Sequence, residues 1–372
     1  MRILALEPYY GGSHKAFVDG WSAASRHNWT MLELAAYKWK WRMRHSAITF
    51  VDQIAQCVAE GQGWDLIFCS DMLNLAEFLG LAPQAVQKLP TVVYFHENQL
   101  TYPVRFESER DYQFVMTNMT TALAAKSVWF NSAFHRDSFL GALAGFLRKM
   151  PDCQPIDAVE RIVGKSLIYP PGVEEIGRRG DRKAGPLRIL WAARWEHDKN
   201  PDDFFEALKI LKTKGINFRV SVIGEQFREV PEVFGWAKRY FAKNIDRWGY
   251  QENRAEYEKA LKQADVFVSI ADHEFFGISA VEAGLAGAYP VLPKRLAYPE
   301  ILGLDEGGMV EEFFYDGSVT ALADRLTMLS GRAEKDCLWG KNPGRVIQLM
   351  KRFTWSDLAS VLDEAAEKVM SE

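Results

Sequence analysis

The sequence predicts an α/β protein of two domains, each built on a parallel, doubly wound sheet. The chain has 372 residues, which is about twice the length of a usual domain. Short apolar runs alternate with amphipathic segments of helical length, as strands and helices do in parallel sheets. A stretch rich in Gly, Pro and charged residues interrupts the alternation, which then resumes. Two domains joined by a linker are therefore expected.

The first half of the chain supplies the predicted N-terminal domain, residues 1–172. Its predicted strands are Ile3–Leu6, Trp29–Leu34, Leu66–Ser70, Thr91–Phe95, Ser127–Asn131 and Ser166–Tyr169. Its predicted helices include Ser46–Ala59, Arg110–Ala125 and Ala133–Lys149. Residues 173–186 are the predicted linker, because Gly, Pro and charge occur there without periodicity.

The second half supplies the predicted C-terminal domain, residues 187–350. Its predicted strands are Arg188–Ala193, Arg219–Ile223, Val266–Ile270 and Tyr289–Leu292. Asn200-Pro201-Asp202-Asp203 predicts a helix start, with Asn as the cap, Pro in the first turn and acids facing the dipole. That helix is expected to continue through Leu211. Residues 351–372 are a predicted C-terminal helix that packs back on the N-terminal domain, after a break around Phe353-Thr354-Trp355.

Composition limits the possible functions. The net charge is −4, so an RNA contact would need a local basic patch. The four cysteines form no CxxC pair, which disfavours a disulfide scaffold or a zinc site and fits a reducing cytosol. The apolar run at the N-terminus is too short for a signal peptide, and no stretch is long enough to span a bilayer. A cytoplasmic protein without a membrane span is expected.

Two α/β halves joined by a linker predict a ligand cleft between the carboxyl ends of two sheets. Glu274 and Glu282 flank Gly277 on a predicted loop that leads into a helix. Backbone N–H groups of such a loop and helix start suit a diphosphate, and here they belong to Phe275, Phe276, Gly277, Ile278 and Ser279. Glu274 is predicted at the sugar end of a nucleotide sugar. Glu282, two helical turns further on, is predicted to accept from ribose hydroxyls. The alternative is a helix N-terminus with solvated carboxylates.

Arg194 and Lys199 lie between a predicted strand end and a capped helix. Two fixed cations at that point suit a diphosphate leaving group. The alternative is a pair of residues that form surface ion pairs.

Gly11-Gly12 follows the first predicted strand directly. Glycines let backbone N–H groups approach a phosphate or a sugar closely, although a plain strand–turn–helix junction also explains them. The segment is not GxGxxG, and no suitably placed acid follows the second strand, so a dinucleotide-binding fold is disfavoured.

Polar residues from His96 to Gln99 follow the fourth predicted strand. At the carboxyl edge of a sheet, His96 could donate to a sugar hydroxyl or to a developing charge; a structural histidine is the alternative. Asn131 ends the next strand, where Asn131-Ser132 could simply cap the following helix.

Bases and aromatic residues alternate from Tyr37 to His45. Cations for phosphates and flat rings for bases are typical of a single-stranded nucleic-acid surface. In an extended strand, one face would carry the basic residues Lys38, Lys40, Arg42 and Arg44 and the other face Trp39 and Trp41. The alternative is an amphipathic edge strand whose tryptophans are core residues.

The sequence predicts no metal site. It has no His/Cys cluster, and Asp202 and Asp203 are explained by the helix start. It also has no P-loop and no nucleophile elbow.

These motifs, together with others, resemble a known family. The matching residues are Gly11-Gly12, His96, Tyr169-Pro170-Pro171-Gly172-Val173, Arg194 with Lys199-Asn200, Val222-Ile223-Gly224-Glu225, and Glu274 through Glu282-Ala283 with Gly287. With them the chain resembles the GT-B glycosyltransferases of family 4, retaining enzymes with two Rossmann-like domains that face each other across a cleft. A closer resemblance, to the tRNA-queuosine α-mannosyltransferase group, is carried by Glu7–Lys15, Lys38–Arg44, Tyr94–Pro103 and Arg194–Lys199. The chain lacks the long insert that animal members carry before the second domain.

The resemblance implies a role for each group of residues. His96, Glu274, Arg194 and Lys199 would be catalytic, and the C-terminal domain would bind the nucleotide sugar. Arg194 and Lys199 would hold the diphosphate, Glu282 the ribose and Glu274 the sugar hydroxyls, while Gly11-Gly12 would close over phosphate. Gly224 and Glu225 also belong to the implied donor site. The N-terminal domain would bind the acceptor through Ser13, His14, Lys38, Trp39, Lys40, Trp41, Arg42, Arg44, Glu97, Asn98, Gln99 and Asn131.

The predicted function is therefore a retaining, metal-independent hexosyltransferase without a cofactor. The resemblance implies GDP-mannose as donor and queuosine in the anticodon of tRNA-Asp as acceptor. One alternative is a family 4 enzyme that uses another nucleotide sugar to build a glycan or glycolipid. Another is a catalytically inactive RNA-binding scaffold.

Overall fold

The chain folds into two α/β units. The computed structural model describes residues 1–104, 108, 110–182, 185–227, 229–304, 307, 310–340 and 344–371. Unit 1 comprises Met1–Glu174 with Phe353–Glu372, and unit 2 comprises Glu175–Arg352. Residues 183 and 184 of the predicted linker lie outside the described part of the chain. The prediction of two α/β halves with parallel sheets is confirmed.

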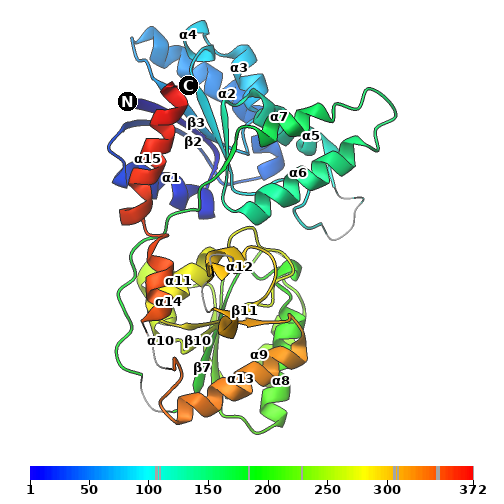
Figure 1. Ribbon diagram of the computed structural model, residues 1–372, viewed down its shortest axis with the longest axis vertical. Helices are drawn as coiled ribbons and strands as arrows, with labels where there is room; N and C mark the ends of the chain where they lie inside the picture. The colour runs from blue at the N-terminus through cyan, green and yellow to red at the C-terminus, as the bar shows by residue number, and fades with distance from the viewer. Residues whose placement is uncertain are drawn as a thin grey trace. The chain divides into compact units, whose positions relative to one another are not determined.

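Unit 1 is built on a six-stranded sheet in the order β2-β1-β3-β4-β5-β6 (Figure 1). Neighbouring strands are parallel throughout. The strands are β1 (Arg2–Tyr10), β2 (Asn28–Ala35), β3 (Leu66–Ser70), β4 (Thr91–Phe95), β5 (Ser127–Phe130) and β6 (Ser166–Ile168). The helices are α1 (Gly12–Ala24), α2 (Trp39–Ala59), α3 (Leu75–Leu81), α4 (Gln84–Gln87), α5 (Tyr112–Ala124), α6 (Ala133–Leu147), α7 (Asp157–Val163) and α15 (Trp355–Ser371). The central strands β3 to β5 are buried on both faces, as continuous apolar runs require.

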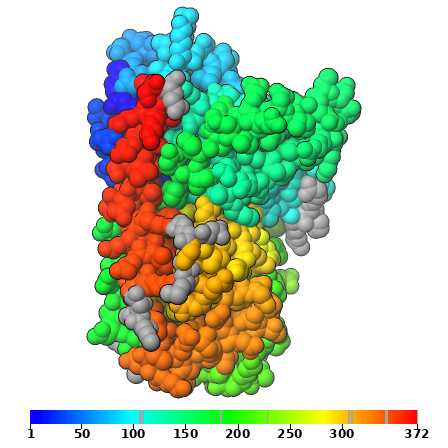
Figure 2. All heavy atoms as spheres, viewed as in Figure 1, coloured from blue at the N-terminus to red at the C-terminus, as the bar shows by residue number. Residues whose placement is uncertain are grey.

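The last helix of the chain, α15, belongs to unit 1 and packs against α1 (Figure 1). Figure 2 shows its surface beside that of the first residues of the chain. The buried carboxylate of Asp363 fixes the contact, because it accepts from Trp21 Nε1 at 2.9 Å and from Ser25 Oγ at 2.7 Å. Trp355 fills the space beside Gly20 and Gly172, where any Cβ would overlap its ring.

Unit 2 is built on a second six-stranded sheet, in the order β12-β11-β10-β7-β8-β9, with parallel neighbours. The strands are β7 (Leu187–Ala192), β8 (Phe218–Ile223), β9 (Ile245–Gly249), β10 (Val266–Val268), β11 (Tyr289–Pro293) and β12 (Phe314–Tyr315). The helices are α8 (Pro201–Thr213), α9 (Val233–Tyr240), α10 (Arg254–Gln263), α11 (Ile278–Ala286), α12 (Tyr298–Ile301), α13 (Val319–Glu334) and α14 (Arg345–Lys351), with short 3₁₀ turns η2 (His197–Lys199) and η4 (Glu311–Phe313).

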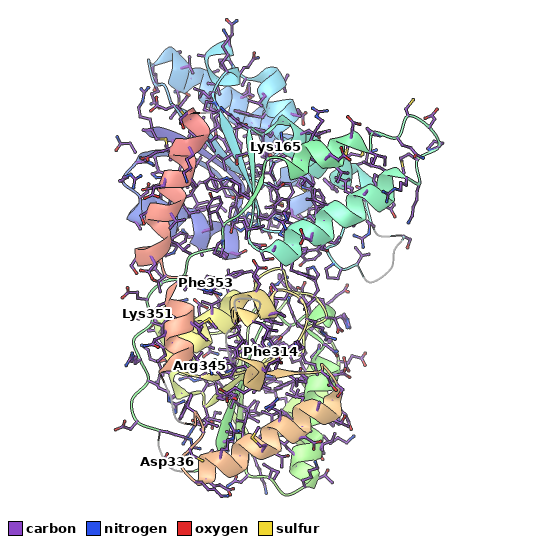
Figure 3. All side chains as sticks on the ribbon, in the orientation of Figure 1. Lys165, Phe314, Asp336, Arg345, Lys351 and Phe353 are labelled. Atoms are coloured by element: carbon purple, nitrogen blue, oxygen red, sulfur yellow. The ribbon has the colours of Figure 1, made fainter. Side chains whose placement is uncertain are left out.

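Short connections hold the ends of several elements. Phe353 follows Lys351 in the connection between α14 and α15 (Figure 3), and its carbonyl accepts from Val173 N at 2.8 Å. Arg345, at the start of α14 (Figure 3), forms an ion pair of 3.3 Å with Glu312, two residues before Phe314. In unit 1, Lys165 Nζ donates to the carbonyl oxygen of Leu123 at 2.7 Å and so ties the start of β6 to the end of α5.

The segment after Tyr37 is helical, so both predictions of an extended or edge strand there were wrong. Helix α2 begins at Trp39 and runs without interruption into the segment predicted to be helical from Ser46. The physical reason is the spacing of its buried residues Met43, Ala47, Phe50 and Ile54, which repeats every three to four residues and forms one apolar face of a helix.

None of the helices in the described part of the chain is long and apolar enough to cross a membrane.

Candidate functional site

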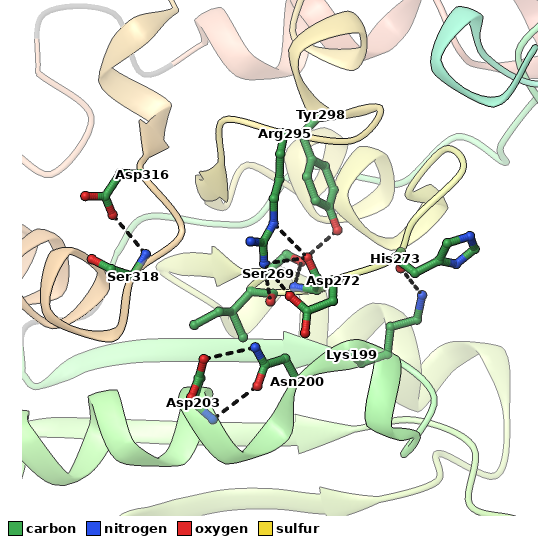
Figure 4. Close-up of polar contacts among 12 residues, drawn as sticks. Lys199, Asn200, Asp203, Ser269, Asp272, His273, Arg295, Tyr298, Asp316 and Ser318 are labelled. Atoms are coloured by element: carbon green, nitrogen blue, oxygen red, sulfur yellow. Dashed lines mark hydrogen bonds and ion pairs between the residues drawn. The ribbon is translucent and has the colours of Figure 1, made fainter. Parts of the chain in front are cut away.

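Polar residues gather at the carboxyl edge of the sheet in unit 2, around Lys199. This side chain is buried, and its Nζ donates to the carbonyl oxygen of His273 at 2.7 Å (Figure 4). Ion pairs join the same nitrogen to Asp198 at 3.2 Å and to Glu274 at 3.3 Å. The turn after β7 and the loop before α11 are therefore joined by a buried cation. Sequence reasoning predicted a cation here, although not its buried position.

Burial would lower the pKa of Lys199, but the carboxylates of Glu274 and Asp198 outweigh it and raise that pKa above its usual value. Lys199 therefore stays charged. The neighbouring His273 behaves in the opposite way, because burial, with Lys199 and Arg194 nearby, lowers its pKa to about 4. A neutral imidazole and a fixed ammonium group thus lie side by side.

Arg194 lies two residues beyond the end of β7 and pairs with Glu196 at 3.3 Å. Its side chain is 38% exposed, so a ligand could reach it without disrupting the core. Its charge acts on both Lys199 and His273. The two cations predicted from the sequence therefore belong to one electrostatic group, together with Glu274.

The loop before α11 ends at Gly277, which is the N-cap of the helix with φ of 101°. Only glycine adopts this conformation readily, and a Cβ would lie 3.1 Å from Tyr298. Phe275 and Phe276 are buried, so their backbones rather than their rings are what a ligand could meet. The first turn of the helix, with Ile278 and Ser279, has no capping side chain among the described residues.

Glu282 lies in the second turn of α11 and is buried. Because the helix begins only at Ile278, the prediction of two helical turns between Glu274 and Glu282 was wrong. Both oxygens of Glu282 are occupied: Oε1 accepts from Arg254 at 2.6 Å and Oε2 accepts from the hydroxyl of Tyr257 at 2.7 Å. Neither partner was predicted from the sequence.

Gly224 and Glu225 follow β8 and lie against the turn that carries Arg194. Gly224 has φ of 151°, and a Cβ there would lie 1.8 Å from the carbonyl oxygen of Ala193. The carbonyl of Glu225 accepts from Trp195 N at 2.9 Å, while its side chain is exposed. The glycine is thus required for the close approach of two loops.

The same edge holds polar residues that sequence reasoning missed. Arg295, two residues after β11, pairs with Asp272 at 2.8 Å and donates to the carbonyl oxygen of Ala271 (Figure 4). Tyr298 shares a hydrogen bond of 2.6 Å with Ser269 (Figure 4). The position of Arg295 directly after a strand was the available signal, because carboxyl ends of parallel strands meet at one edge.

In unit 1, the carboxyl edge of the sheet carries Gly11, Gly12, Ser13 and His14 at the start of α1. Gly11 is extended, and a Cβ there would lie 2.4 Å from Ala36 Cβ. Gly12 has φ of 53° and Ser13 is exposed. The two positions therefore require glycine for different reasons: Gly11 allows a close approach to Ala36, and Gly12 allows a left-handed backbone.

His96 follows β4 and is enclosed by rings. The ring centroids of His14 and Tyr94 lie 4.0 Å and 4.6 Å from that of His96. Within the described chain, its Nε2 is buried and has no hydrogen-bond partner. Burial, with His14 nearby, lowers the pKa of His96 well below its usual value. His96 is therefore a neutral imidazole held in a fixed orientation, and its predicted role in donating a hydrogen bond stays a prediction.

A buried ion pair lies beneath His96. His14 Nδ1 lies 3.2 Å from Glu7 Oε1, and both side chains are buried. Burial alone would lower the pKa of His14, but Glu7 outweighs it and raises that pKa to about 9. Asp71, which accepts from His96 N at 2.8 Å, has its pKa raised by burial. Glu7 and Asp71 were missed, although an acid inside the apolar strand β1 was a signal.

Most of the other polar residues at this edge hold the fold. Asn131 donates to the carbonyl of His96 at 2.9 Å and pairs with His135 Nδ1 at 2.8 Å, while Ser132 caps α6. Asn98 is buried and organises its own loop by accepting from Thr101 N at 2.8 Å. Gln99 Nε2 donates to Glu97 at 3.1 Å. The predicted acceptor contacts of Glu97, Asn98, Gln99 and Asn131 stay predictions.

In the described part of the chain, Glu7, His14 and His96 each offer one atom that could bind a metal ion. These three atoms lie within 4.8 Å of one another. A protonated His14 paired with Glu7 is a poor ligand, because metals bind neutral imidazole. A cavity of about 490 Å³ lies beside Arg182, Leu187 and Asn217. Leu187 opens β7, so this cavity is at the amino edge of the sheet, opposite Arg194 and Lys199.

Comparison with known proteins decides the family. Residues 2–173 match the family model described as tRNA-queuosine alpha-mannosyltransferase N-terminal, and residues 173–342 match that of the glycosyl transferases group 1. The chain is 37% identical over 311 residues to the tRNA-queuosine alpha-mannosyltransferase of Drosophila melanogaster. This alignment covers 80% of this chain and 81% of that protein. The chain belongs to the tRNA-queuosine alpha-mannosyltransferase family. Its resemblance to the GT-B glycosyltransferases of family 4 is thereby confirmed.

More distant relatives of this queuosine mannosyltransferase family member agree with the class. A GDP-mannose-dependent alpha-(1-6)-phosphatidylinositol dimannoside mannosyltransferase of Mycobacterium tuberculosis is 27% identical over 154 residues, 41% of this chain and 38% of that protein. The solved sucrose-phosphate synthase of Thermosynechococcus elongatus has a TM-score of 0.72 at 15% identity and covers 100% of both chains. The second likeness concerns the fold alone, which is GT-B.

The basic–aromatic patch of this family member lies at the N-terminal end of α2 and comprises Lys38, Trp39, Lys40, Trp41, Arg42 and Arg44. The helix separates its two tryptophans. Trp41 is 62% exposed and its ring lies 4.9 Å from that of His45, whereas Trp39 packs on Phe114 at 5.1 Å. Arg42 donates to the carbonyl of Ala35 at 3.0 Å. Only part of the patch is therefore available to a ligand.

Proposed function

We propose that this protein is a retaining, metal-independent mannosyltransferase that moves mannose from GDP-mannose to queuosine in the anticodon of tRNA-Asp. The name of the Drosophila relative supports the acceptor and the sugar. The name of the mycobacterial relative supports GDP-mannose as donor. A cytoplasmic location fits a tRNA acceptor. The observation that carries the chemistry is the buried Lys199 beside Glu274, at the loop that leads into α11.

The donor diphosphate is assigned to Arg194, Lys199 and the first turn of α11. As the bond to the anomeric carbon breaks, negative charge builds on the leaving diphosphate. Fixed cations and helix-terminal N–H groups stabilise that charge without reorganising. One such donor is worth about 3 kcal/mol, or about a hundredfold in rate. Lys199 is suited to this role because it is held by a carbonyl and two carboxylates before any ligand arrives.

The remaining donor contacts follow from side-chain chemistry. Glu274, 25% exposed, is assigned to hydroxyls of the mannose, and Glu282 to those of the ribose. His96 is assigned to the sugar near its reacting carbon, and a neutral imidazole suits that role because it can donate without repelling an oxocarbenium-like sugar. No side chain in this set is assigned as a covalent nucleophile. Retention is therefore assigned to same-face attack assisted by the leaving phosphate.

The tRNA is assigned to the patch at the start of α2. Its basic side chains can meet phosphates, and the uncapped first turn of a helix adds a positive end. The exposed ring of Trp41 can stack on an unpaired base, a contact worth about 1–3 kcal/mol. These features favour the single-stranded part of an anticodon loop.

The test combines purified protein with radiolabelled GDP-mannose and tRNA-Asp that carries queuosine. The expected result is labelled tRNA whose migration is retarded in an acid gel. Matched tRNA-Asp with guanosine in place of queuosine is the control and should stay unlabelled. Added chelator should leave the rate unchanged.

Other outcomes separate the alternatives. Label that passes from GDP-mannose only to a glycan or lipid extract would replace the tRNA acceptor. A protein that binds tRNA but shows no heat of binding with GDP-mannose or any UDP-sugar in calorimetry would be an inactive scaffold.

A further inference from the structure

Glu282 is held from both sides by the first turn of the neighbouring helix α10. Its Oε1 accepts from Arg254 Nη1 at 2.6 Å and its Oε2 accepts from the hydroxyl of Tyr257 at 2.7 Å. The two donors are three residues apart on α10, so they lie on one face of that helix, and α10 packs against α11. The carboxylate therefore has one fixed rotation and one fixed plane.

We propose that Arg254 and Tyr257 are positioning residues that fix Glu282 to read the ribose of the donor, so that the site selects ribonucleotides over deoxyribonucleotides. The inference rests on the proposed function, because it takes Glu282 as the ribose contact. It goes further by naming the residues that set the geometry and the selectivity that results.

The two donors are themselves held in place. Arg254 Nε donates to Glu258 Oε1 at 3.2 Å, and Lys262 pairs with the other oxygen of Glu258 at 3.2 Å. Asn253 caps the helix, since its side chain accepts from Glu256 N at 3.0 Å. A chain of contacts thus runs from Lys262 to Glu282 along one face of α10. Burial and the Glu282 carboxylate keep the Tyr257 hydroxyl protonated by raising its pKa well above its usual value.

The chemistry of a carboxylate explains why two donors leave it able to bind sugar. An ionised carboxylate offers about four lone-pair sites, and two are taken by Arg254 and Tyr257. The sites that remain are fixed in direction and can accept from two adjacent hydroxyls. A sugar that lacks one hydroxyl leaves a buried acceptor unsatisfied, which is why sites built to bind a hydroxyl reject its deoxy analogue. Removing Arg254 or Tyr257 gives the carboxylate freedom to turn and weakens this selection.

The test measures binding of GDP, 2′-deoxy-GDP and 3′-deoxy-GDP to the full chain by calorimetry, for the wild type and for Tyr257→Phe and Arg254→Lys. The wild type should bind GDP about 10- to 100-fold tighter than at least one deoxy analogue. In both variants this ratio should fall toward one. UDP and 2′-deoxy-UDP form a second pair, so that the result does not depend on the base.

Two matched controls come from the same unit. Tyr289→Phe removes another partly buried hydroxyl, which donates to the carbonyl of Glu312 at 2.9 Å. Arg247→Lys weakens another ion pair of α10, with Glu256 at 2.8 Å. Both should keep the wild-type ratio. Thermal unfolding of each variant shows whether it is folded, and either test variant suffices if the other fails to fold.

The possible outcomes separate a failure of the inference from a failure of the proposed function. If Tyr257→Phe and Arg254→Lys weaken GDP and its deoxy analogues equally, the residues only support the fold and the inference is overturned, while the proposed function stands. If the wild type binds GDP and both deoxy analogues equally well, the inference is overturned together with the assignment of Glu282 to the ribose, while the proposed transfer of mannose stands. If the wild type binds no nucleoside diphosphate, the proposed function and the inference both fail.

Discussion

The buried ammonium group of Lys199 forms an ion pair of 3.3 Å with the partly exposed Glu274, and this pair joins the turn after β7 to the loop before α11. The same ammonium group donates to the carbonyl of His273 at 2.7 Å. One side chain therefore both closes the loop and supplies positive charge at the carboxyl edge of the sheet. Its two duties predict two separable effects of mutation.

Replacing Lys199 by Met should lower turnover by about a hundredfold or more and also lower the temperature of unfolding. The second effect is expected because Glu274 and Asp198 lose a buried partner, and breaking a buried pair costs about 3–5 kcal/mol. Arg194→Ala should lower turnover similarly with little change in stability, because Arg194 is partly exposed. Steady-state transfer rates and thermal unfolding measure both. Lys209→Ala, in an exposed pair with Glu206, is the control. Near-normal turnover in both test variants would refute the assignment of the diphosphate.

Gly11→Ala and Gly12→Ala should differ in cost although the two glycines are adjacent. A Cβ on Gly11 would lie 2.4 Å from Ala36 Cβ, where β1 and the end of β2 meet, so the backbone must move. Such overpacking costs about 1–3 kcal/mol. Gly12 has φ of 53° and open space around it, so Ala there should cost about 1 kcal/mol. Urea unfolding of the two variants measures the difference, and equal costs would contradict the close approach at Gly11.

The sequence was sufficient for the fold class and for the central strands of unit 1, because β3, β4 and β5 are apolar runs buried on both faces. It missed β9, whose Asp246 and Arg247 are those of an edge strand, and β12, which has only two residues. It also missed the start of α2, although Met43, Ala47 and Phe50 show the helical spacing. Local alternation of bases and tryptophans masked that longer period.

Several residues of the candidate site were predicted because they closely follow a strand. Arg194, His96 and the Gly11-Gly12 turn were found in this way, since strand ends of a parallel sheet meet at one edge. The partners of Glu282 could not be found, because Arg254 reaches it from 28 residues earlier in the chain. The pairing of Glu7 with His14 was hidden for a similar reason: an acid within a strand shows its purpose only when the following helix is placed.

Stability should depend on pH through His14. Because its pKa is raised in the fold, from 6.5 to about 9, the imidazolium contributes stability that is fully present below pH 6.5. This contribution is lost as pH rises through about 9 and amounts to about 3 kcal/mol, at about 1.4 kcal/mol for each pH unit. Asp71, whose pKa is also raised, acts in the same direction. His96, whose pKa is lowered, stays neutral in this window.

To separate the effect of His14 from that of Asp71, the pH dependence of stability is measured in an Asp71→Asn background. The amide oxygen of this asparagine can still accept from His96 N. Unfolding free energies of this variant, with and without His14→Gln, should be measured between pH 6 and about 9.5. The slope with pH should be present with His14 and largely absent without it. Parallel curves would show that His14 does not carry the charge, and the Glu7 ion pair would lose its assigned role.

Replacing either tryptophan at the start of α2 should affect a different property: tRNA binding for Trp41 and stability for Trp39. Trp41→Ala should weaken binding of queuosine-containing tRNA-Asp by about 5- to 150-fold, the equivalent of about 1–3 kcal/mol for one stacked base, without a change in stability. Trp39→Ala should instead destabilise the chain, because Trp39 packs on Phe114 at 5.1 Å. Lys40→Ala should reduce the slope of affinity against salt concentration by about one phosphate contact.

Trp236, exposed and stacked on Tyr240 at 4.9 Å in unit 2, provides the control variant Trp236→Ala. Fluorescence anisotropy over a salt series measures tRNA binding by the four variants, and thermal unfolding measures their stability. Equal losses of affinity for Trp41→Ala and Trp236→Ala would show that the start of α2 has no particular part in holding the tRNA.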